Sequence, residues 1–263
     1  MEAAATLFID KPRRANALQR RPVMRDTSRD QALYWTWSIG GGPFSGLDVD
    51  IERRVEDLVT TRLRLCKGST LYRAGEPFAS LYAIQAGSLK TVLLAEDGTE
   101  QVAGYHMAGD VIGLDGIGGE DHQCEAIAQE DSDVCVLPFA SIEQLGRSCP
   151  AFQHSIHRYL SHEIARQSSM MLLLGTMPAP RRLATFLLEL SQRYQARGYS
   201  ASEFILRMTR QEIGSYLGLK LETVSRLLAR FHGSGLIHVQ GRTVKLLDHG
   251  ALKRLAHTGW RWE

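Results

Sequence analysis

The chain has 263 residues, of which 44% are hydrophobic and 23% are charged. This balance is typical of a folded globular protein and excludes a wholly disordered or fibrous chain. No stretch approaches the roughly 18 to 20 apolar residues that span a bilayer, and the N-terminus lacks the apolar core of a signal peptide, so we expect a cytoplasmic protein without membrane contact.

The net charge of +2 conceals an uneven distribution along the chain. Residues 1–33 contain 7 Lys and Arg against 4 Asp and Glu, residues 34–175 contain 10 against 19, and residues 176–263 contain 14 against 6. A basic C-terminal third on an acidic body indicates that this end of the chain meets a polyanion, for which nucleic acid is the natural candidate. Charge excess alone is a weak signal, because helices often carry a solvated charged face.

Residues 1–43 are expected to form a basic arm. Its first 33 residues contain few large apolar side chains, so they bury too little surface to offset the entropy of ordering. The aromatic cluster Tyr34-Trp35-Thr36-Trp37 precedes Gly40-Gly41-Gly42-Pro43. We interpret this cluster as an anchor that docks the arm on the folded body.

Residues 44–149 are expected to form an antiparallel β-roll. Short apolar runs such as Leu81-Tyr82-Ala83-Ile84 and Leu89-Lys90-Thr91-Val92-Leu93-Leu94 alternate with glycine-containing turns. Strands repeated at this spacing are typical of small barrels and rolls. Asp97-Gly98 follows the second run and is a strong hairpin signal.

A long helix is predicted over residues 150–177, between Pro150 and the helix breakers Pro178 and Pro180. Apolar residues recur near steps of three and four, as an amphipathic helix requires. Such a stripe can pack on the same chain, but between two domains it favours pairing with a second copy. The predicted dimerisation residues are Ile156, Leu160, Ile164, Met171 and Leu174.

Residues 178–263 are expected to form a winged helix-turn-helix. Thr209 and Glu212 have the spacing of a capping box, which begins a short helix that ends at Gly218. A second amphipathic helix runs from Lys220 to Phe231, and two short apolar runs around Gln240-Gly241-Arg242 form the hairpin of a wing. The whole chain is therefore predicted to be an α+β protein.

The start of the second helix carries side chains that can distinguish base pairs. Arg226 can donate two parallel hydrogen bonds to guanine, Glu222 can accept from the cytosine amino group, and Ser225 can do either. Leu221 suits a thymine methyl group. The alternative is an exposed Glu222–Arg226 ion pair without function. The predicted phosphate contacts, which position the domain without reading sequence, are Arg210, Ser215, Lys220 and Arg242.

These motifs resemble those of the CRP/FNR superfamily of bacterial transcription regulators. The resemblance is carried by Thr209-Arg210-Gln211-Glu212-Ile213-Gly214 and Leu221-Glu222-Thr223-Val224-Ser225-Arg226, and it extends over about residues 44–258. It implies a cyclic-nucleotide-binding-like roll and a cytoplasmic homodimer that activates transcription from double-stranded DNA. The apolar residue before Glu222 is similar to the FNR and FixK branches, which implies inverted repeats of TTGAT-like half-sites. It also implies that RNA polymerase contacts the hairpin residues Glu96, Asp97, Gly98, Thr99 and Glu100.

The family's cofactors are not expected here. The FNR sensor holds an iron–sulfur cluster with N-terminal cysteines and one central cysteine. Cys135 matches the central one, but residues 34–40 contain no cysteine, and a [4Fe–4S] cluster normally needs four thiolates. Cyclic AMP would need an arginine that residues 112–124 lack. Haem on His106, His122 or a cysteine has no CxxCH motif to support it. We therefore expect no cofactor, no metal, and dimerisation and DNA binding that do not require removal of oxygen.

Two other interpretations compete with that of a regulator that binds DNA without a signal. The roll could bind an unidentified ligand and gate the DNA-binding domain. Alternatively, the thiol of Cys66 could act as a redox switch, because the neighbouring Lys67 favours a thiolate. The remaining cysteines, Cys124 and Cys149, form no CxxC pair with the others, so four free thiols are expected. An enzyme is not expected, since no phosphate loop, metal quartet or nucleophile elbow occurs.

Overall fold

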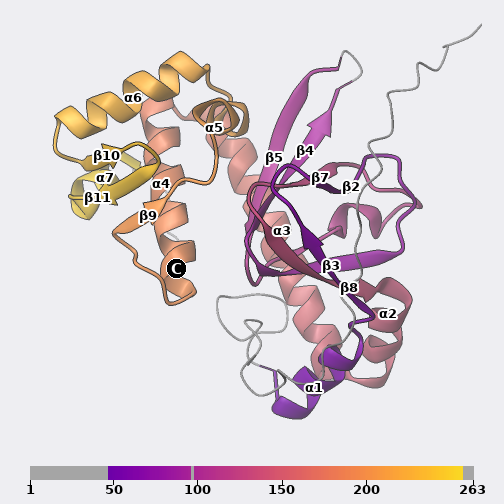
Figure 1. The fold of residues 1–263 in the computed structure, drawn as a ribbon. Helices are drawn as coiled ribbons and strands as arrows, with labels where there is room; N and C mark the ends of the chain where they lie inside the picture. Colours follow the sequence, from indigo (N-terminus) through magenta and orange to yellow (C-terminus); the bar gives the residue numbers. More distant parts are fainter. Residues whose placement is uncertain (1–46, 96–97, 257–263) are drawn as a thin grey trace, which may run out of the picture.

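The computed structural model describes residues 47–95 and 98–256. It confirms the predicted α+β architecture, in which a β-roll and a small C-terminal domain are joined by one long helix (Figure 1). The expected basic arm and aromatic anchor of residues 1–43 lie outside the described residues, as do Glu96 and Asp97 of the predicted polymerase loop.

The roll consists of two antiparallel sheets of four strands each. One sheet has the order β1 (Thr61–Leu65), β8 (Ser132–Pro138), β3 (Ser80–Ala86), β6 (Val111–Ile112). The other has the order β2 (Thr70–Tyr72), β7 (Glu125–Ala128), β4 (Ser88–Leu94), β5 (Glu100–Met107). The predicted hairpin is present as β4 and β5. Alternate side chains of the strands, including Leu65, Ile84, Leu89 and Val134, fill the interior with one apolar cluster.

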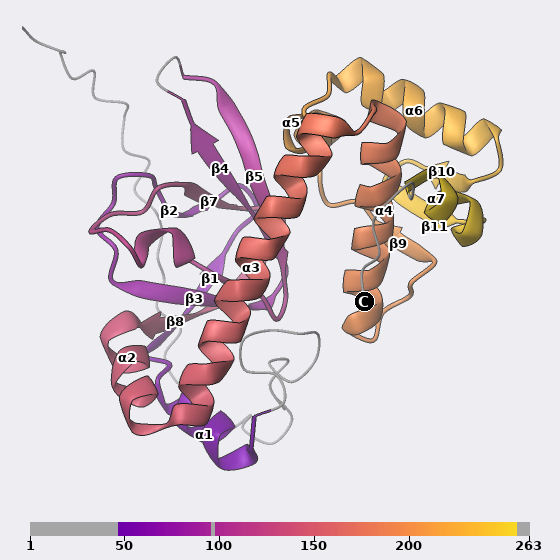
Figure 2. The same ribbon diagram turned by 180° about the vertical axis from the view of Figure 1, so that it is seen from behind.

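Three helices lie against the first sheet. These are α1 (Val49–Asp57), α2 (Phe139–Ser148) and the N-terminal half of α3 (Pro150–Thr176), with a short 3-10 turn at Leu114–Gly116 nearby. Phe152 and Tyr159 of α3 are buried against this sheet, and the Tyr159 hydroxyl bonds both the amide (3.1 Å) and the carbonyl (3.2 Å) of Val111. Figure 2 shows α3 running from α2 along the roll to the C-terminal domain.

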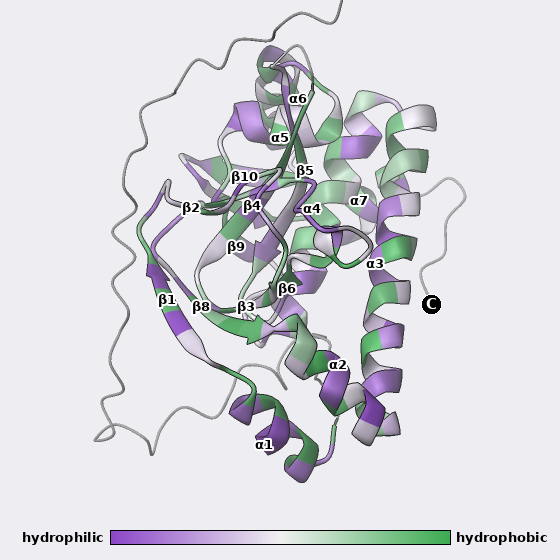
Figure 3. Cartoon of the chain, turned by 90° about the vertical axis from the view of Figure 1, so that its right-hand side faces the viewer, coloured by the Kyte–Doolittle hydropathy of each residue, from purple (hydrophilic) through white to green (hydrophobic). Residues whose placement is uncertain are grey.

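The long helix has apolar residues on more than one side. Bands of hydrophobic and hydrophilic residues alternate along α3 in Figure 3. One set of apolar residues packs on the roll and another stays exposed. None of the helices in the described part of the chain is long and apolar enough to cross a membrane.

The C-terminal domain is the predicted winged helix-turn-helix. It begins with α4 (Ala179–Ala196) and ends with α7 (His249–Ala256), and between them lie β9 (Glu203–Ile205), α5 (Arg210–Leu217), α6 (Leu221–Gly233), β10 (Ile237–Gln240) and β11 (Thr243–Leu246). The three strands form one antiparallel sheet in the order β10, β11, β9. Val102 and Tyr105 of β5 belong to the same apolar cluster as the core of this domain, so the roll and the domain share a packed interface.

Candidate nucleic-acid interface

The turn between α5 and α6 is fixed by local sequence. The Thr209 hydroxyl accepts a hydrogen bond from the Glu212 amide at 3.2 Å. The Glu212 carboxylate accepts one from the Thr209 amide at 2.7 Å, which completes the predicted capping box. Gly218 ends α5 with φ +62°, a left-handed conformation that glycine adopts without strain. A Cβ on Gly214 would lie 2.5 Å from the Leu219 carbonyl oxygen. The two helices can therefore approach this closely only with glycine at 214.

The inner face of α6 anchors the helix and leaves its outer face free. Val224, Leu227, Leu228 and Phe231 are buried in the domain core. On the other side Glu222 and Arg226 are exposed, Leu221 is 44% exposed and Ser225 is partly buried. Among the described residues neither Glu222 nor Arg226 forms an ion pair. Four predicted base-reading residues thus lie on the accessible part of one helix.

Three of the four predicted phosphate contacts are exposed, and the fourth is bonded within the chain. Arg210 begins α5, Lys220 immediately precedes α6 and Arg242 lies in the wing turn, and all three are exposed. The wing turn is held beside the approach to α5, because the Leu206 amide bonds the Arg242 carbonyl at 2.8 Å. Ser215, in contrast, is used within the chain: its hydroxyl accepts the Val102 amide of β5 at 2.9 Å. In this arrangement Ser215 is not available to a phosphate.

Ser215 is engaged because α5 docks on the roll. Lys90 of β4 donates to Glu212 at 2.6 Å, the carboxylate that also completes the capping box. Burial favours the neutral form of Glu212, but hydrogen bonds from Lys90 and Thr209 hold its pKa below the ordinary value. Around this contact the rings of Tyr105 and Tyr216 meet edge to face at 5.1 Å.

A second polar contact joins the roll to α4. The buried carboxylate of Asp110 accepts from Arg193 at 2.5 Å, from Arg197 at 2.6 Å and from the Met107 amide at 2.8 Å. Burial alone would raise the pKa of Asp110, but the two guanidinium groups hold it below its usual range. At the edge of the same interface Arg207 pairs with Glu130 at 3.0 Å. This interface was not predicted from the sequence.

The predicted dimerisation residues differ in how far they are exposed on α3. Ile164 and Met171 are 68% and 75% exposed, but Ile156 and Leu174 pack against the cores of the same chain and Leu160 is only partly exposed. Ile156 and Leu174 therefore also contact the roll and the C-terminal domain of the same chain, and their part in dimerisation stays a prediction. A continuous exposed row with alternating spacings of three and four, which we call the seam, is formed by His154, His157, Ser161, Ile164, Ser168, Met171 and Gly175.

Comparison with known proteins agrees with both parts of the fold. Residues 62–149 match the cyclic nucleotide-binding domain and residues 181–255 match the Crp-like helix-turn-helix domain. The chain is 44% identical over 210 residues to the transcriptional regulatory protein btr of Bordetella pertussis, covering 80% of this chain and 87% of that protein. The protein belongs to the CRP/FNR family of transcription regulators.

Other family members are similarly close. The fumarate and nitrate reduction regulatory protein of Escherichia coli K12 is 41% identical, over 82% of this chain and 86% of its own length. Among solved structures, FixK2 from Bradyrhizobium japonicum is 32% identical with a TM-score of 0.71, covering 77% of this chain and all of that one. Membership of this family establishes a DNA-binding transcription regulator as the general class of this protein.

The iron–sulfur cluster of the FNR branch does not fit this chain. Its four cysteines lie at 66, 124, 135 and 149, and none precedes residue 66. Cys135 is fully buried, which raises the pKa of its thiol to about 11, and it donates to the Gln85 side chain at 3.7 Å. Cys66 is exposed between β1 and β2. Among the described residues no group of three or more His, Cys, Asp or Glu side chains in one chain could hold a metal.

The loop that would bind a cyclic nucleotide in this family also fits poorly. Residues 112–124 contain no arginine. Instead, the Asp115 carboxylate accepts hydrogen bonds from the backbone amides of Gln123 (2.8 Å) and Cys124 (3.1 Å). The rings of Tyr72 and His122 stack at 3.8 Å nearby. A phosphodiester in this loop would meet a carboxylate in place of a guanidinium.

Both histidines considered for haem contact other side chains of the roll. His106 is bonded to the Thr91 hydroxyl at 3.0 Å, and burial lowers its pKa to about 3. The cavity beside His106 measures only about 20 Å³. His122 is buried in the stack with Tyr72.

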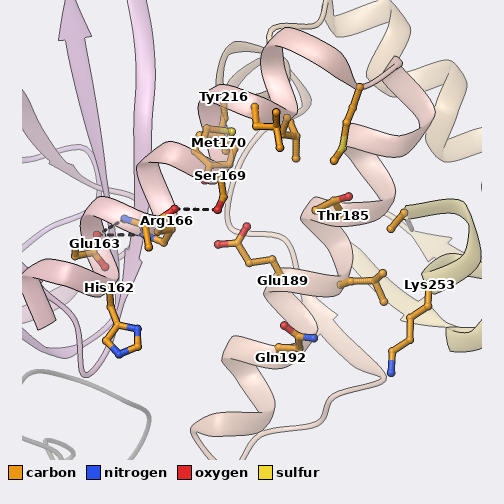
Figure 4. A pocket seen from close by; sticks show the side chains of 16 residues that line it. His162, Glu163, Arg166, Ser169, Met170, Thr185, Glu189, Gln192, Tyr216 and Lys253 are labelled. Atoms are coloured by element: carbon orange, nitrogen blue, oxygen red, sulfur yellow. Dashed lines mark hydrogen bonds and ion pairs between the residues drawn. The ribbon is translucent and has the colours of Figure 1, made fainter. Parts of the chain in front are cut away.

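A larger cavity of about 340 Å³ lies between α3, α4 and α7. Figure 4 shows Glu163 and Arg166 of α3 facing Thr185, Glu189 and Gln192 of α4, and Lys253 closes one side. Arg166 and Glu163 pair at 2.7 Å within it. None of the seam residues lines this cavity, so it belongs to the side of α3 that faces the DNA-binding domain.

Proposed function

We propose that the protein is a sequence-specific transcription regulator that binds, as a homodimer, inverted repeats of TTGAT-like half-sites. The observation that carries this proposal is the exposed outer face of α6, on which Glu222, Ser225 and Arg226 are free to meet base edges. Arg226 pairs with guanine through two hydrogen bonds, Glu222 accepts from cytosine, and Leu221 packs on a thymine methyl group. Arg210, Lys220 and Arg242 neutralise the flanking phosphates.

Two copies are needed because one α6 reads only one half-site. Pairing along the seam of α3 places two recognition helices on successive major grooves, about 34 Å apart. Ile164 and Met171 are 68% and 75% exposed, and burying these exposed fractions in both copies contributes roughly 4 to 9 kcal/mol, at about 1.5 to 3 kcal/mol per fully buried side chain. Association itself costs about 4 to 15 kcal/mol, so burial of Ile164 and Met171 alone gives a dimer of marginal stability.

The homodimer forms in air and needs no iron–sulfur cluster. Residues 165–169 of α3 carry no acidic side chain that would repel its counterpart across a parallel pair. Sedimentation of aerobically purified protein should therefore show dimers that bind operator DNA. A monomer that is inactive in air and becomes an active dimer without oxygen would contradict this part of the proposal.

RNA polymerase is the proposed protein partner. Gly98, Thr99 and Glu100 lie at the end of the β4–β5 hairpin, and the other two predicted contacts, Glu96 and Asp97, lie outside the described residues. Ser215 of α5 bonds the backbone of the same hairpin, so a polymerase seated on its tip is close to the DNA-binding domain.

The proposal is tested by fluorescence anisotropy on a TTGAT inverted repeat and on the same duplex with permuted half-sites. Glu222→Ala and Arg226→Ala should each reduce the preference for the repeat by about 1–3 kcal/mol. Arg254→Ala, which removes the same charge from α7, is the matched control and should keep the preference. Unchanged selectivity in both α6 variants would refute the assignment of the reading face.

Ligand gating is the second candidate, and the cavity between α3 and α4 favours it. A small molecule bound there would contact both the dimerisation helix and the first helix of the DNA-binding domain. Thr185→Trp should fill the cavity. The DNA affinity of this variant should then be the same with and without an added extract of the small molecules of the cell. A redox role for Cys66 remains a prediction, which Cys66→Ser tests by loss of any response to peroxide.

A further inference from the structure

Two histidines occupy the N-terminal end of the exposed seam of α3. His154 and His157 are three residues apart, so both lie on the same face of the helix, and both are exposed. In heptad terms they take successive a and d positions, followed by Ser161, Ile164, Ser168, Met171 and Gly175 at the same repeat. The two apolar side chains of the seam stand at d positions, where His157 also stands.

We propose that a second copy of this chain completes a zinc site at this end of the seam. In a parallel pair of α3 helices, His154 and His157 of both copies project toward the dimer axis in two adjacent layers. Four imidazoles then surround one divalent transition metal ion. The inference rests on the homodimer proposed above, because one chain supplies only half of the ligands.

The spacing of the layers suits tetrahedral coordination. Residues three apart are separated by about 4.5 Å along a helix, since each residue rises 1.5 Å. Zinc binds imidazole nitrogen at about 2.0 to 2.1 Å and is usually four-coordinate when its role is structural. An ion midway between the two layers is therefore within reach of ligands from both. The next a position is Ser161, a small residue that leaves room for the rings.

The chemistry of the seam also explains why a ligand is needed there. A dimer interface gains most from apolar side chains, and polar rings that lose water without a partner destabilise it. Zinc would accept an electron pair from each ring and remove this cost. Because no group of three or more ligands for a metal occurs among the described residues of one chain, the ion should bind the dimer and not the monomer.

The test uses the full chain without a histidine tag, stripped with a chelator and kept reduced. Zinc is added alone, with magnesium as the control ion, and bound metal and sedimentation are measured. We expect one zinc per dimer and a dimer dissociation constant at least tenfold lower with zinc. The double variant His154→Gln, His157→Gln should lose both effects. His162→Gln on the same helix, which lines the cavity facing α4, should keep both.

The possible results separate the zinc site from the homodimer. Dimers that form without zinc and are not tightened by it would overturn the zinc site and leave the homodimer in place. Zinc bound one per chain, or bound equally by the double variant, would also overturn it. A chain that stays monomeric with and without zinc would contradict both the zinc site and the proposed dimer.

Discussion

The pair of arginines on Asp110 makes the docking of the DNA-binding domain sensitive to one substitution. Asp110→Ala would leave the guanidinium groups of Arg193 and Arg197 buried at the interface without their carboxylate. Removing one partner of a buried ion pair costs about 3–5 kcal/mol. That is a large part of the roughly 5–15 kcal/mol by which a domain is stable. We expect the urea midpoint, followed by circular dichroism, to fall accordingly.

Two further variants make this prediction specific. Asp133→Ala breaks an exposed pair with Arg64 and should cost only about 0–1 kcal/mol. The triple variant Asp110→Ala, Arg193→Met, Arg197→Met should be more stable than Asp110→Ala, because most of the cost comes from the unpaired charges. Equal losses for Asp110→Ala and Asp133→Ala, or no recovery in the triple variant, would refute the reasoning.

Three other predictions follow from named contacts. The pKa of Asp110 in the folded state lies below its unfolded value of about 3.9, so the ionised carboxylate stabilises the fold fully above about pH 3.9, and this stabilisation is lost as the pH falls through the folded pKa. Between pH 7 and pH 3 the urea midpoint should therefore fall in the wild-type protein, and it should fall less in Asp110→Ala. Gly214→Ala should lower stability by about 1–3 kcal/mol in urea unfolding because its Cβ would meet the Leu219 carbonyl, whereas Gly233→Ala, with open space around it, should not. Ile164→Asp should weaken dimers at least tenfold in sedimentation, while His162→Asp should not, and equal effects of the two would exclude the seam.

The helix-turn-helix was predictable because its signals are local. The capping box at Thr209, the glycine at 218 and the apolar spacing of α6 are read within about 25 residues, and each is decided by neighbours in sequence. The exposure of Arg226 follows from that same periodicity. The hairpin of β4 and β5 was predictable for a similar reason, since its turn and both strands are adjacent.

The docking interface was not predictable in this way. Asp110 is separated from Arg193 by 83 residues and from Arg197 by 87, and nothing in the local sequence of either segment indicates the other. Docking of the two parts also explains why Ser215 bonds β5, whereas the sequence predicted a contact with phosphate. A serine on the first helix of the motif is expected to be exposed unless another part of the chain packs against it. On α3, apolar residues occur on two faces, and only the position of the roll shows that Ile156 faces inward while Ile164 does not.

The central claim is that the outer face of α6 reads base pairs. The most direct measurement is selection of binding sites by the wild-type protein from random duplex DNA, sequenced and repeated with Arg226→Ala. We expect the wild-type protein to select a two-fold symmetric motif with half-site centres one helical turn apart. Arg226→Ala should lose the preference for one guanine in each half-site. A motif without symmetry, or an identical motif from Arg226→Ala, would contradict it.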